Sequence, residues 1–169
     1  MDADPSLAPT EPSPPSNASK GCVLLGLGGA FLVGLGLFIA IPNYVSMASR
    51  AKRAELPTTV EEIRTAQLAH HAASGRFVAC GNELDARSAL VGDAGKRARE
   101  FNPGDDPCWD ELGWGPEGQL RGAYWVEVSA SGDDFKITGI SDVDADGEYA
   151  IFAATRDGEV DMVSPPHAY

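Results

Sequence analysis

The sequence predicts an α+β protein in which a long N-terminal helix packs on an antiparallel sheet of roughly four strands. Three observations support this fold class. From Cys22 to Ile41 the chain has 20 residues without a charge, which is the length of a helix that crosses a bilayer. Residues 42–75 continue with apolar positions at helical spacing. Residues 122–169 then alternate at period two between turn motifs.

Residues 1–21 are expected to be a disordered leader that can be cleaved. The first part of this segment holds five prolines and almost no large apolar side chain, so it cannot bury enough surface to offset its ordering entropy. A cleaved secretory signal is not expected, because the apolar run that follows is too long and its flank is acidic.

Residues 22–41 are predicted to be the transmembrane half of the helix. Gly26, Ala30 and Gly34 recur every four residues and fall on one helix face. Such a face lets another helix approach closely, although glycine is also common in membrane helices in general. Pro42 lacks a backbone donor and is expected to bend the helix at the membrane edge.

Residues 42–75 are predicted to be an amphipathic, water-exposed half of the same helix. Pro57 interrupts the pattern, and two candidate capping boxes follow it, so we expect a kink near Pro57 or a new helical segment from about Thr58. Gly75 is expected to cap the end of the helix. The boxes pair Thr58 with Glu61 or Thr59 with Glu62, and the apolar stripe consists of Tyr44, Val45, Met47, Ala48, Ala51, Leu56, Val60, Ile63, Ala66, Gln67 and His70.

Residues 76–121 are predicted to be a loop-rich connection with one short helix around Ala86–Phe101. The segment contains Cys80 and Cys108, whose flanks lack the spacing of zinc or thioredoxin-like sites. In an oxidising compartment a disulfide between them would close a loop of about 29 residues and add about 3 to 4 kcal/mol of stability. Two separate buried thiols are the alternative.

Residues 122–169 are predicted to form an antiparallel sheet with short connections. One face of such a sheet must be covered, and the apolar stripe of the helix is the obvious cover. The four strand-like segments are Gly122–Ala130, Asp134–Ser141, Glu148–Arg156 and Glu159–Ser164.

Composition and motifs exclude several classes of function. The formal net charge is -12, and it arises from residues 77–169, so binding to a phosphate backbone is not expected. His70 and His71 are adjacent and point about 100° apart on a helix, so they cannot serve one metal, and packing is their expected role. No nucleophile, phosphate-loop or zinc-protease motif is present, and no catalysis is expected. Five aromatic residues fit either a core or a binding cleft: Trp109, Trp114, Tyr124, Trp125 and Phe135.

The stretch Ser141–Ala150 places Asp142, Asp144 and Asp146 around a turn. Alternating carboxylates can converge on a hard cation such as calcium, which takes six to eight oxygens. A complete EF-hand is excluded, because its twelfth position would be Ala153. The sequence leaves two interpretations open, a calcium-binding loop and a solvated hairpin turn.

The order of these parts resembles the type IV pilins and the related secretion-system pseudopilins. "KGCVLLGLGGAFLVGLGLFIAIPNY" is similar to the N-terminal signature of that family, in which a glycine marks prepilin-peptidase cleavage before an apolar helix and an Ile-Pro-Asn motif. The stretch from Ser49 to Phe77 is similar to the next part of the pilin helix, with matches at Arg50, Ala51, Lys52, Glu55, Ile63, Thr65, Ala66, Gln67, Gly75 and Arg76.

The resemblance implies cleavage between Gly21 and Cys22 and assembly, through the helix, into a type IV pilus or pseudopilus, with this chain as a homo- or hetero-oligomeric subunit. It implies other pilin subunits and the assembly machinery as partners, and a calcium loop in the distal sheet of some pseudopilins. The chain departs from the family where a glutamate is usual, because Gly26 or Leu25 holds that place. The departure fits a minor subunit, or a membrane-tethered binding or sensory domain that never polymerises.

The resemblance also implies a single pass through a bacterial inner membrane, with the C-terminal domain in the periplasm or in an extracellular pilus. The basic residues Arg50, Lys52 and Arg53 would, by the positive-inside rule, place that domain in the cytoplasm. Related pilins carry basic residues at the same place, so the periplasmic orientation is the one expected here.

Overall fold

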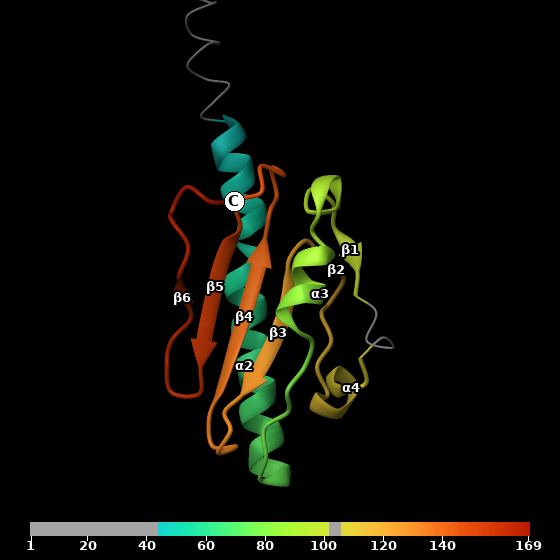
Figure 1. Cartoon of the computed structure of the whole chain (residues 1–169), viewed down its shortest axis with the longest axis vertical. Coiled ribbons are helices and arrows are strands. Elements are labelled where there is room, and N and C mark those ends of the chain that lie inside the picture. The colour runs from blue at the N-terminus through green and yellow to red at the C-terminus, as the bar shows by residue number, and fades with distance from the viewer. Residues whose placement is uncertain (1–43, 102–105) are drawn as a thin grey trace, which may run out of the picture. The chain divides into compact units, whose positions relative to one another are not determined.

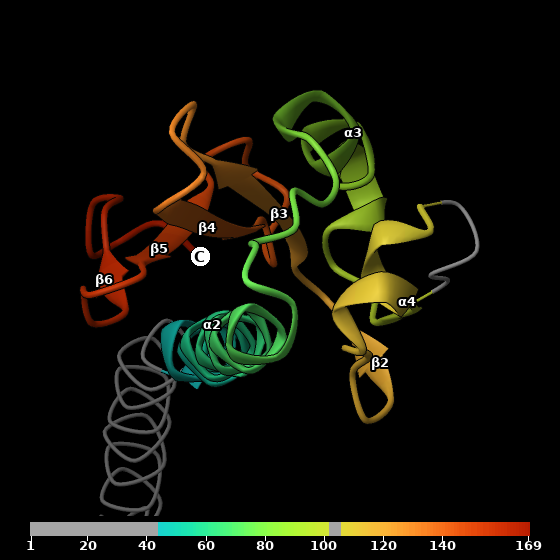
Figure 2. The same cartoon turned by 90° about the horizontal axis from the view of Figure 1, so that it is seen from below.

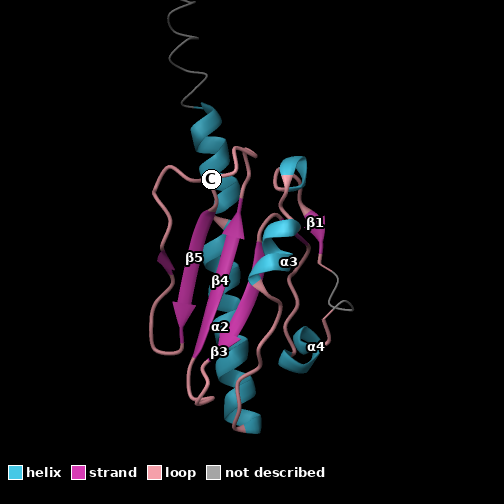
Figure 3. Cartoon of the chain, in the orientation of Figure 1, coloured by secondary structure: helices cyan, strands magenta, loops and turns pink. Residues whose placement is uncertain are grey.

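Helix α2 (Glu55–Ser74) lies along one face of a four-stranded antiparallel sheet in a computed structural model that describes residues 44–101 and 106–169 (Figure 1). The sheet order is β3-β4-β5-β6. The strands are β3 (Ala123–Val128), β4 (Phe135–Ser141), β5 (Ala150–Thr155) and β6 (Asp161–Met162). For the described residues, this arrangement confirms the predicted α+β class and the antiparallel sheet (Figure 3).

The helix is interrupted at Ala54. Residues 44–53 are helical, Ala54 is a turn residue, and α2 begins at Glu55. The predicted capping box at Thr58 or Thr59 is wrong, because the N-cap is Ala54 and no side chain caps it. Pro57 falls in the first turn of α2, where a missing backbone donor costs little, so the chain does not need a new start after it.

The far end of α2 follows the prediction. Gly75 takes the left-handed conformation (φ 76°), and its N–H donates to the carbonyl of His71 at 2.8 Å. The chain then turns back, and Gln67 holds the returning segment. The Gln67 amide, fully buried, donates to the Val78 carbonyl at 2.6 Å and accepts from the Val78 N–H at 3.0 Å.

The core lies between α2 and the sheet. Strand β4 pairs in register with β3, from Ala123 opposite Ile140 to Val128 opposite Phe135. A Cβ at Gly139 would come within 2.9 Å of both Tyr124 and Val60, so a glycine on β4 permits this close approach of the helix. The central side chains of this core are Leu56, Val60, Ile63, Tyr124, Val126, Phe135, Ile137 and Ala154.

The connection between helix and sheet holds more structure than predicted. It contains α3 (Glu83–Ser88), the 3-10 helix η1 (Gly92–Ala94) and α4 (Cys108–Leu112), with β1 (Arg99–Glu100) paired to β2 (Gln119–Leu120). The predicted helix around Ala86–Phe101 is therefore wrong in its bounds. Asn82 caps α3 by accepting from the Asp85 N–H at 2.9 Å, which fixes an earlier start.

The face of the sheet opposite α2 is partly covered by α3 (Figure 2). Ala86 and Leu90 pack there against Trp125 and Ile140. Two elements thus cover the sheet, one on each face, and the described residues form a head with two small cores. The prediction considered a cover for one face only.

Candidate functional site

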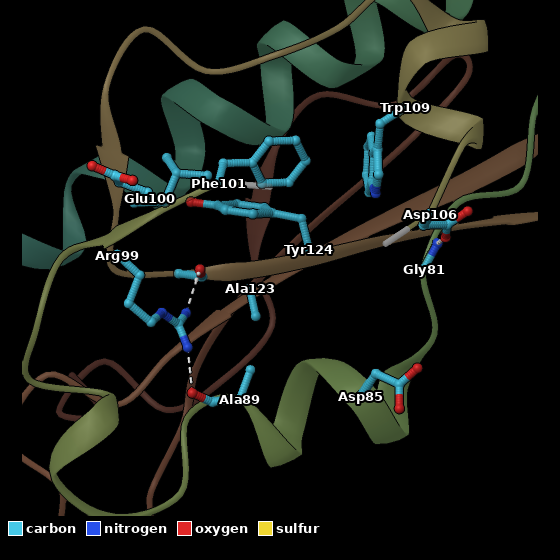
Figure 4. Close-up of a pocket in the computed structure, with 12 residues that line it drawn as sticks. Gly81, Asp85, Ala89, Arg99, Glu100, Phe101, Asp106, Trp109, Ala123 and Tyr124 are labelled. Atoms are coloured by element: carbon cyan, nitrogen blue, oxygen red, sulfur yellow. Dashed lines mark hydrogen bonds between the residues drawn. The ribbon is translucent and has the colours of Figure 1, made fainter. Parts of the chain in front are cut away.

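A cavity of about 420 Å³ lies between α3, β1, α4 and the start of β3 (Figure 4). Its wall is aromatic, formed by Phe101, Trp109 and Tyr124, and charged groups stand at its ends. Arg99 lies at one end, and Asp85 and Asp106 lie at the other. A mostly apolar hollow of this size with a few polar groups is typical of sites for small ligands or single side chains.

Arg99 is held in place by backbone carbonyl groups. Its guanidinium donates to the carbonyls of Ala89 and Arg121, and to that of Gly122 at 3.0 Å. Burial lowers the pKa of Arg99, and the nearby carboxylate of Glu55 opposes this shift. Through these bonds Arg99 connects the end of α3 to the β2–β3 turn, so its main role is structural.

Glu55 fastens the start of α2 to the same turn. Its carboxylate accepts from the Arg121 N–H at 2.9 Å, from the Gly122 N–H at 3.1 Å and from the Tyr124 hydroxyl at 3.1 Å. Burial, with the negative charge of Glu55 nearby, raises the pKa of Tyr124 far above its ordinary value. Tyr124 therefore stays protonated and acts as a hydrogen-bond donor.

The other end of the cavity is held by a disulfide. The structure joins Cys80 and Cys108, with 5.5 Å between their Cα atoms, and this is the pair singled out from the sequence. Asp106 beside it accepts from the Gly81 N–H at 2.8 Å and from the Cys108 N–H at 3.3 Å. The described side chains that line the cavity include the carboxylates of Asp85, Glu100 and Asp106 and no serine, cysteine, histidine or lysine.

Asp142, Asp144 and Asp146 do come together at the β4–β5 turn, where their nearest carboxylate oxygens lie within 4.8 Å of one another. The buried Asp142 accepts from the N–H groups of Asp146 and Gly147, each at 3.2 Å, which builds the turn without an ion. Burial, then the charge of Asp146, raises the pKa of Asp144. The three side chains could supply part of a calcium shell, and they also explain the turn by themselves.

The two histidines point to different neighbours, as their spacing predicts. His71 stacks on Phe77 with 4.3 Å between ring centroids, whereas His70 Nε2 lies 3.9 Å from Glu111 Oε1. Of the five aromatic candidates, Trp109, Trp114, Tyr124 and Phe135 belong to the main core and Trp125 to the core under α3. Trp109 and Tyr124 also line the cavity.

The first helical residues that the structure describes, 44–53, form what we call the exposed end. Tyr44, Val45 and Met47 are 75%, 55% and 69% exposed, although all three belong to the predicted apolar stripe. Arg50 and Lys52 are also exposed. The exposed end thus carries three exposed apolar side chains beside two exposed basic ones.

The C-terminal tail, residues 165–169, is fastened at the base of the exposed end. Arg53 donates to the carbonyls of Pro166, at 3.1 Å, and Ala168, and its guanidinium lies 5.2 Å from the ring centroid of Tyr169. The Val143 N–H donates to the Tyr169 carbonyl at 3.1 Å. The tail thereby joins the helix to the β4–β5 turn.

Several predicted site residues lie outside the described residues. These are the processing residues Gly21 and Cys22 and the helix-packing residues Gly26, Ala30, Gly34 and Pro42, together with the leader (1–21) and the apolar run (22–41). No helix in residues 44–101 and 106–169 is long and apolar enough to cross a membrane.

Sequence reasoning missed the residues that hold the head together by charge. Arg53, Glu55 and Arg99 each bind backbone groups at least 10 residues away along the chain, and no local pattern marks such partners. Of these three residues, only Glu55 was marked in the sequence, as one of the positions at which the chain resembles the pilin helix.

The chain has no match among protein-family models, curated proteins or solved structures.

Proposed function

We propose that this chain is a structural, pilin-like subunit. It would insert in a membrane through its apolar run, Cys22–Ile41, and assemble through its N-terminal helix into a type IV pilus or pseudopilus. The helix of residues 44–74 would continue back through that run as one rod, with the head fixed to its far half. Membrane insertion would store the subunit, and assembly would exchange lipid contacts for contacts with other helices.

One observation supports this proposal above all: the apolar side chains of the helix are buried at one end and exposed to solvent at the other. From Leu56 to Gln67 it is embedded against the sheet, whereas Tyr44, Val45 and Met47 extend into solvent directly after an apolar run of membrane-spanning length. A helix that served only the head would not expose such side chains. Burial against lipid and later against neighbouring helices accounts for them.

The proposal is tested by enlarging the small residues of the apolar run. Lipid tails are already apolar, so close packing along Gly26, Ala30 and Gly34 must supply much of the gain on assembly. Replacing Ala30 and Gly34 with Leu should leave membrane insertion intact and abolish incorporation into filaments. Unchanged incorporation would refute that role, and the matched control is Val33→Leu, which enlarges a side chain without filling the small-residue face.

The cavity favours a second candidate, a membrane-tethered binding domain that does not polymerise. An aromatic wall with Arg99 at one end and Asp85 and Asp106 at the other is compatible with a small ligand. The intact mass of the purified protein separates the two candidates. A mature chain that begins at Cys22 supports prepilin processing and the filament subunit, whereas a full-length chain supports the tether.

A further inference from the structure

We propose that the cavity between α3 and β3 binds a small organic cation, that is, an ammonium, amidinium or guanidinium group carried on a flat or apolar body. The filament subunit proposed above gives this cavity no role. The inference rests on the second candidate function only in that a ligand enters the cavity, and it adds the chemical class of that ligand.

The charged groups that line the cavity leave it negative. Asp85, Glu100 and Asp106 contribute three carboxylates, whereas Arg99 is the one basic side chain among the described lining residues. Within the part of the chain that the structure describes, none of these three carboxylates takes part in an ion pair. A cation that enters the cavity therefore meets carboxylates that have no partner of opposite charge.

Two of the carboxylates are held at one end of the cavity by adjacent residues. Asp106 accepts from the Gly81 N–H at 2.8 Å, and Asp85 accepts from the side-chain amide of Asn82 at 2.6 Å. Both carboxylates therefore lie at the end of the cavity opposite Arg99 (Figure 4). A carboxylate has about four acceptor sites. Asp106, which also accepts from the Cys108 N–H, and Asp85 can each still accept from a ligand.

The aromatic wall beside this end is fixed by the core. Trp109 and Tyr124 are buried, and the ring of Phe101 packs edge-on to Trp109 with 5.8 Å between centroids. Trp109 is close to the acidic end, because its N–H donates to the carbonyl of Asp106 at 3.3 Å. Aromatic faces attract cations, as carboxylates do. A wall that is already in place needs little ordering when a ligand binds.

Anions and single metal ions fit the cavity less well. Arg99 uses both terminal nitrogens on backbone carbonyls, and the carboxylates repel an anion. In the described ranges, the one group of three carboxylate or histidine side chains close enough to share a metal ion is Asp142, Asp144 and Asp146, which do not line the cavity. A hollow of about 420 Å³ with an aromatic wall suits a larger, partly apolar ligand.

The test uses the full chain in mild detergent and two pairs of probes, each a cation with its neutral counterpart. The pairs are benzamidine with benzamide, and cyclohexylamine with cyclohexanol. Isothermal titration calorimetry should show that each cation binds at least about tenfold more tightly than its counterpart, which lacks the charge-assisted bond to a carboxylate. The inference is overturned if neither cation binds at millimolar concentration, or if cation and counterpart bind equally.

Substitutions then assign the binding to the acidic end. Asp85→Asn should weaken benzamidine binding about tenfold, because it removes a charge and keeps an acceptor for the Asn82 amide. Asp106→Asn should act in the same way; its Tm shows whether it is folded, and Asp85→Asn decides the matter if it is not. The matched control is Asp110→Asn, which removes an exposed carboxylate of α4 outside the cavity and should bind as the wild type does. Unchanged binding by Asp85→Asn would overturn the inference.

The indole N–H resonance of Trp109 reports where the cation lies. In NMR spectra of the nitrogen-15-labelled chain, benzamidine should shift this resonance more than that of Trp125, which belongs to the core under α3 and does not line the cavity. A larger shift at Trp125 would place the cation elsewhere and overturn the inference.

Failure of this inference can be distinguished from failure of the proposed function. A chain that binds no cation but enters filaments would overturn the inference and leave the filament subunit standing. A mature chain that begins at Cys22 and binds benzamidine would refute the tether and support the cation site.

Discussion

Two stretches of one helix differ in how completely the head buries their side chains. In α2 the apolar side chains Leu56, Val60 and Ile63 are at most 1% exposed, and the buried Gln67 has both ends of its amide bonded. In the exposed end, residues 44–53, large apolar side chains are mostly in water. The difference teaches that α2 is a structural part of the head, whereas the head does not cover the large apolar side chains of the exposed end.

The largest effect is expected from a side chain in the buried stretch. Ile63→Ala should lower the free energy of unfolding by about 3 to 4 kcal/mol, because it leaves a cavity beneath a fully buried position. Met47→Ala in the exposed end should change it by less than about 0.5 kcal/mol. Denaturant unfolding of the full chain in mild detergent, followed by tryptophan fluorescence, measures both, and similar losses would break the comparison.

The disulfide is expected to contribute almost as much to the stability of the head. Replacing Cys80 and Cys108 together with Ala should cost about 3 kcal/mol, because the unfolded chain regains the freedom of the closed loop. The same unfolding experiment under non-reducing conditions measures the loss. A stability equal to that of the wild type would show that the bridge adds nothing to the head.

Glu55 lies at the boundary between the two stretches: it is the first residue of α2, and its carboxylate is bound to the head. Its substitution therefore tests where the structural part of the helix begins. Glu55→Ala should cost about 1 to 3 kcal/mol, since the N–H groups of Arg121 and Gly122 lose their acceptor and Arg99 loses a nearby countercharge. The matched control, Glu62→Ala, removes an exposed carboxylate about two turns further along α2 and should stay within about 0.5 kcal/mol. Equal effects would argue against the clamp.

The smallest effect is expected at the β4–β5 turn and depends on pH. Because the pKa of Asp144 is raised in the folded state, its ionisation disfavours the fold, so its contribution to stability is greatest at low pH and falls as pH rises through the folded pKa. Asp144→Asn should therefore raise Tm slightly at pH 7, and the gain should vanish near pH 3. Asp110→Asn, an exposed carboxylate of α4, is the control; a gain that persists at pH 3 would contradict the assignment.

Calcium separates the two interpretations of the same turn. Bound calcium would raise the Tm of the wild type, because it would offset the repulsion among Asp142, Asp144 and Asp146, and it would raise that of Asp144→Asn much less. A solvated turn would leave both values unchanged. Thermal unfolding with and without calcium, and with magnesium as the control ion, makes the distinction.

The sheet and the buried side of the helix could be predicted from the sequence, because both depend on local periodicity. Period two marked the four strands, and 3.6-residue spacing marked Leu56, Val60, Ile63 and Gln67, all of which are buried. Cys80 and Cys108 were found because no other cysteine lies beyond the apolar run.

The parts that sequence reasoning missed depend on contacts between distant residues. The helix near Ala86 was extended too far, because Asn82 sets its start and nothing periodic sets its end. The cavity and its clamps arise from Arg99 and Glu55 bonding to turns 10 to 67 residues away, which no window of local sequence reveals. The exposure of Tyr44 and Met47 was also not predicted, because an apolar stripe alone does not show how far along the helix the sheet covers it.

The most direct test of the filament subunit is to find where the chain lies after filaments are sheared from the cells that produce it. The account predicts the chain in the sheared filament fraction, with residues 44–53 protected from hydrogen exchange relative to the detergent-solubilised monomer. A chain found only in the membrane fraction, with residues 44–53 exchanging as fast as in the monomer, would contradict it.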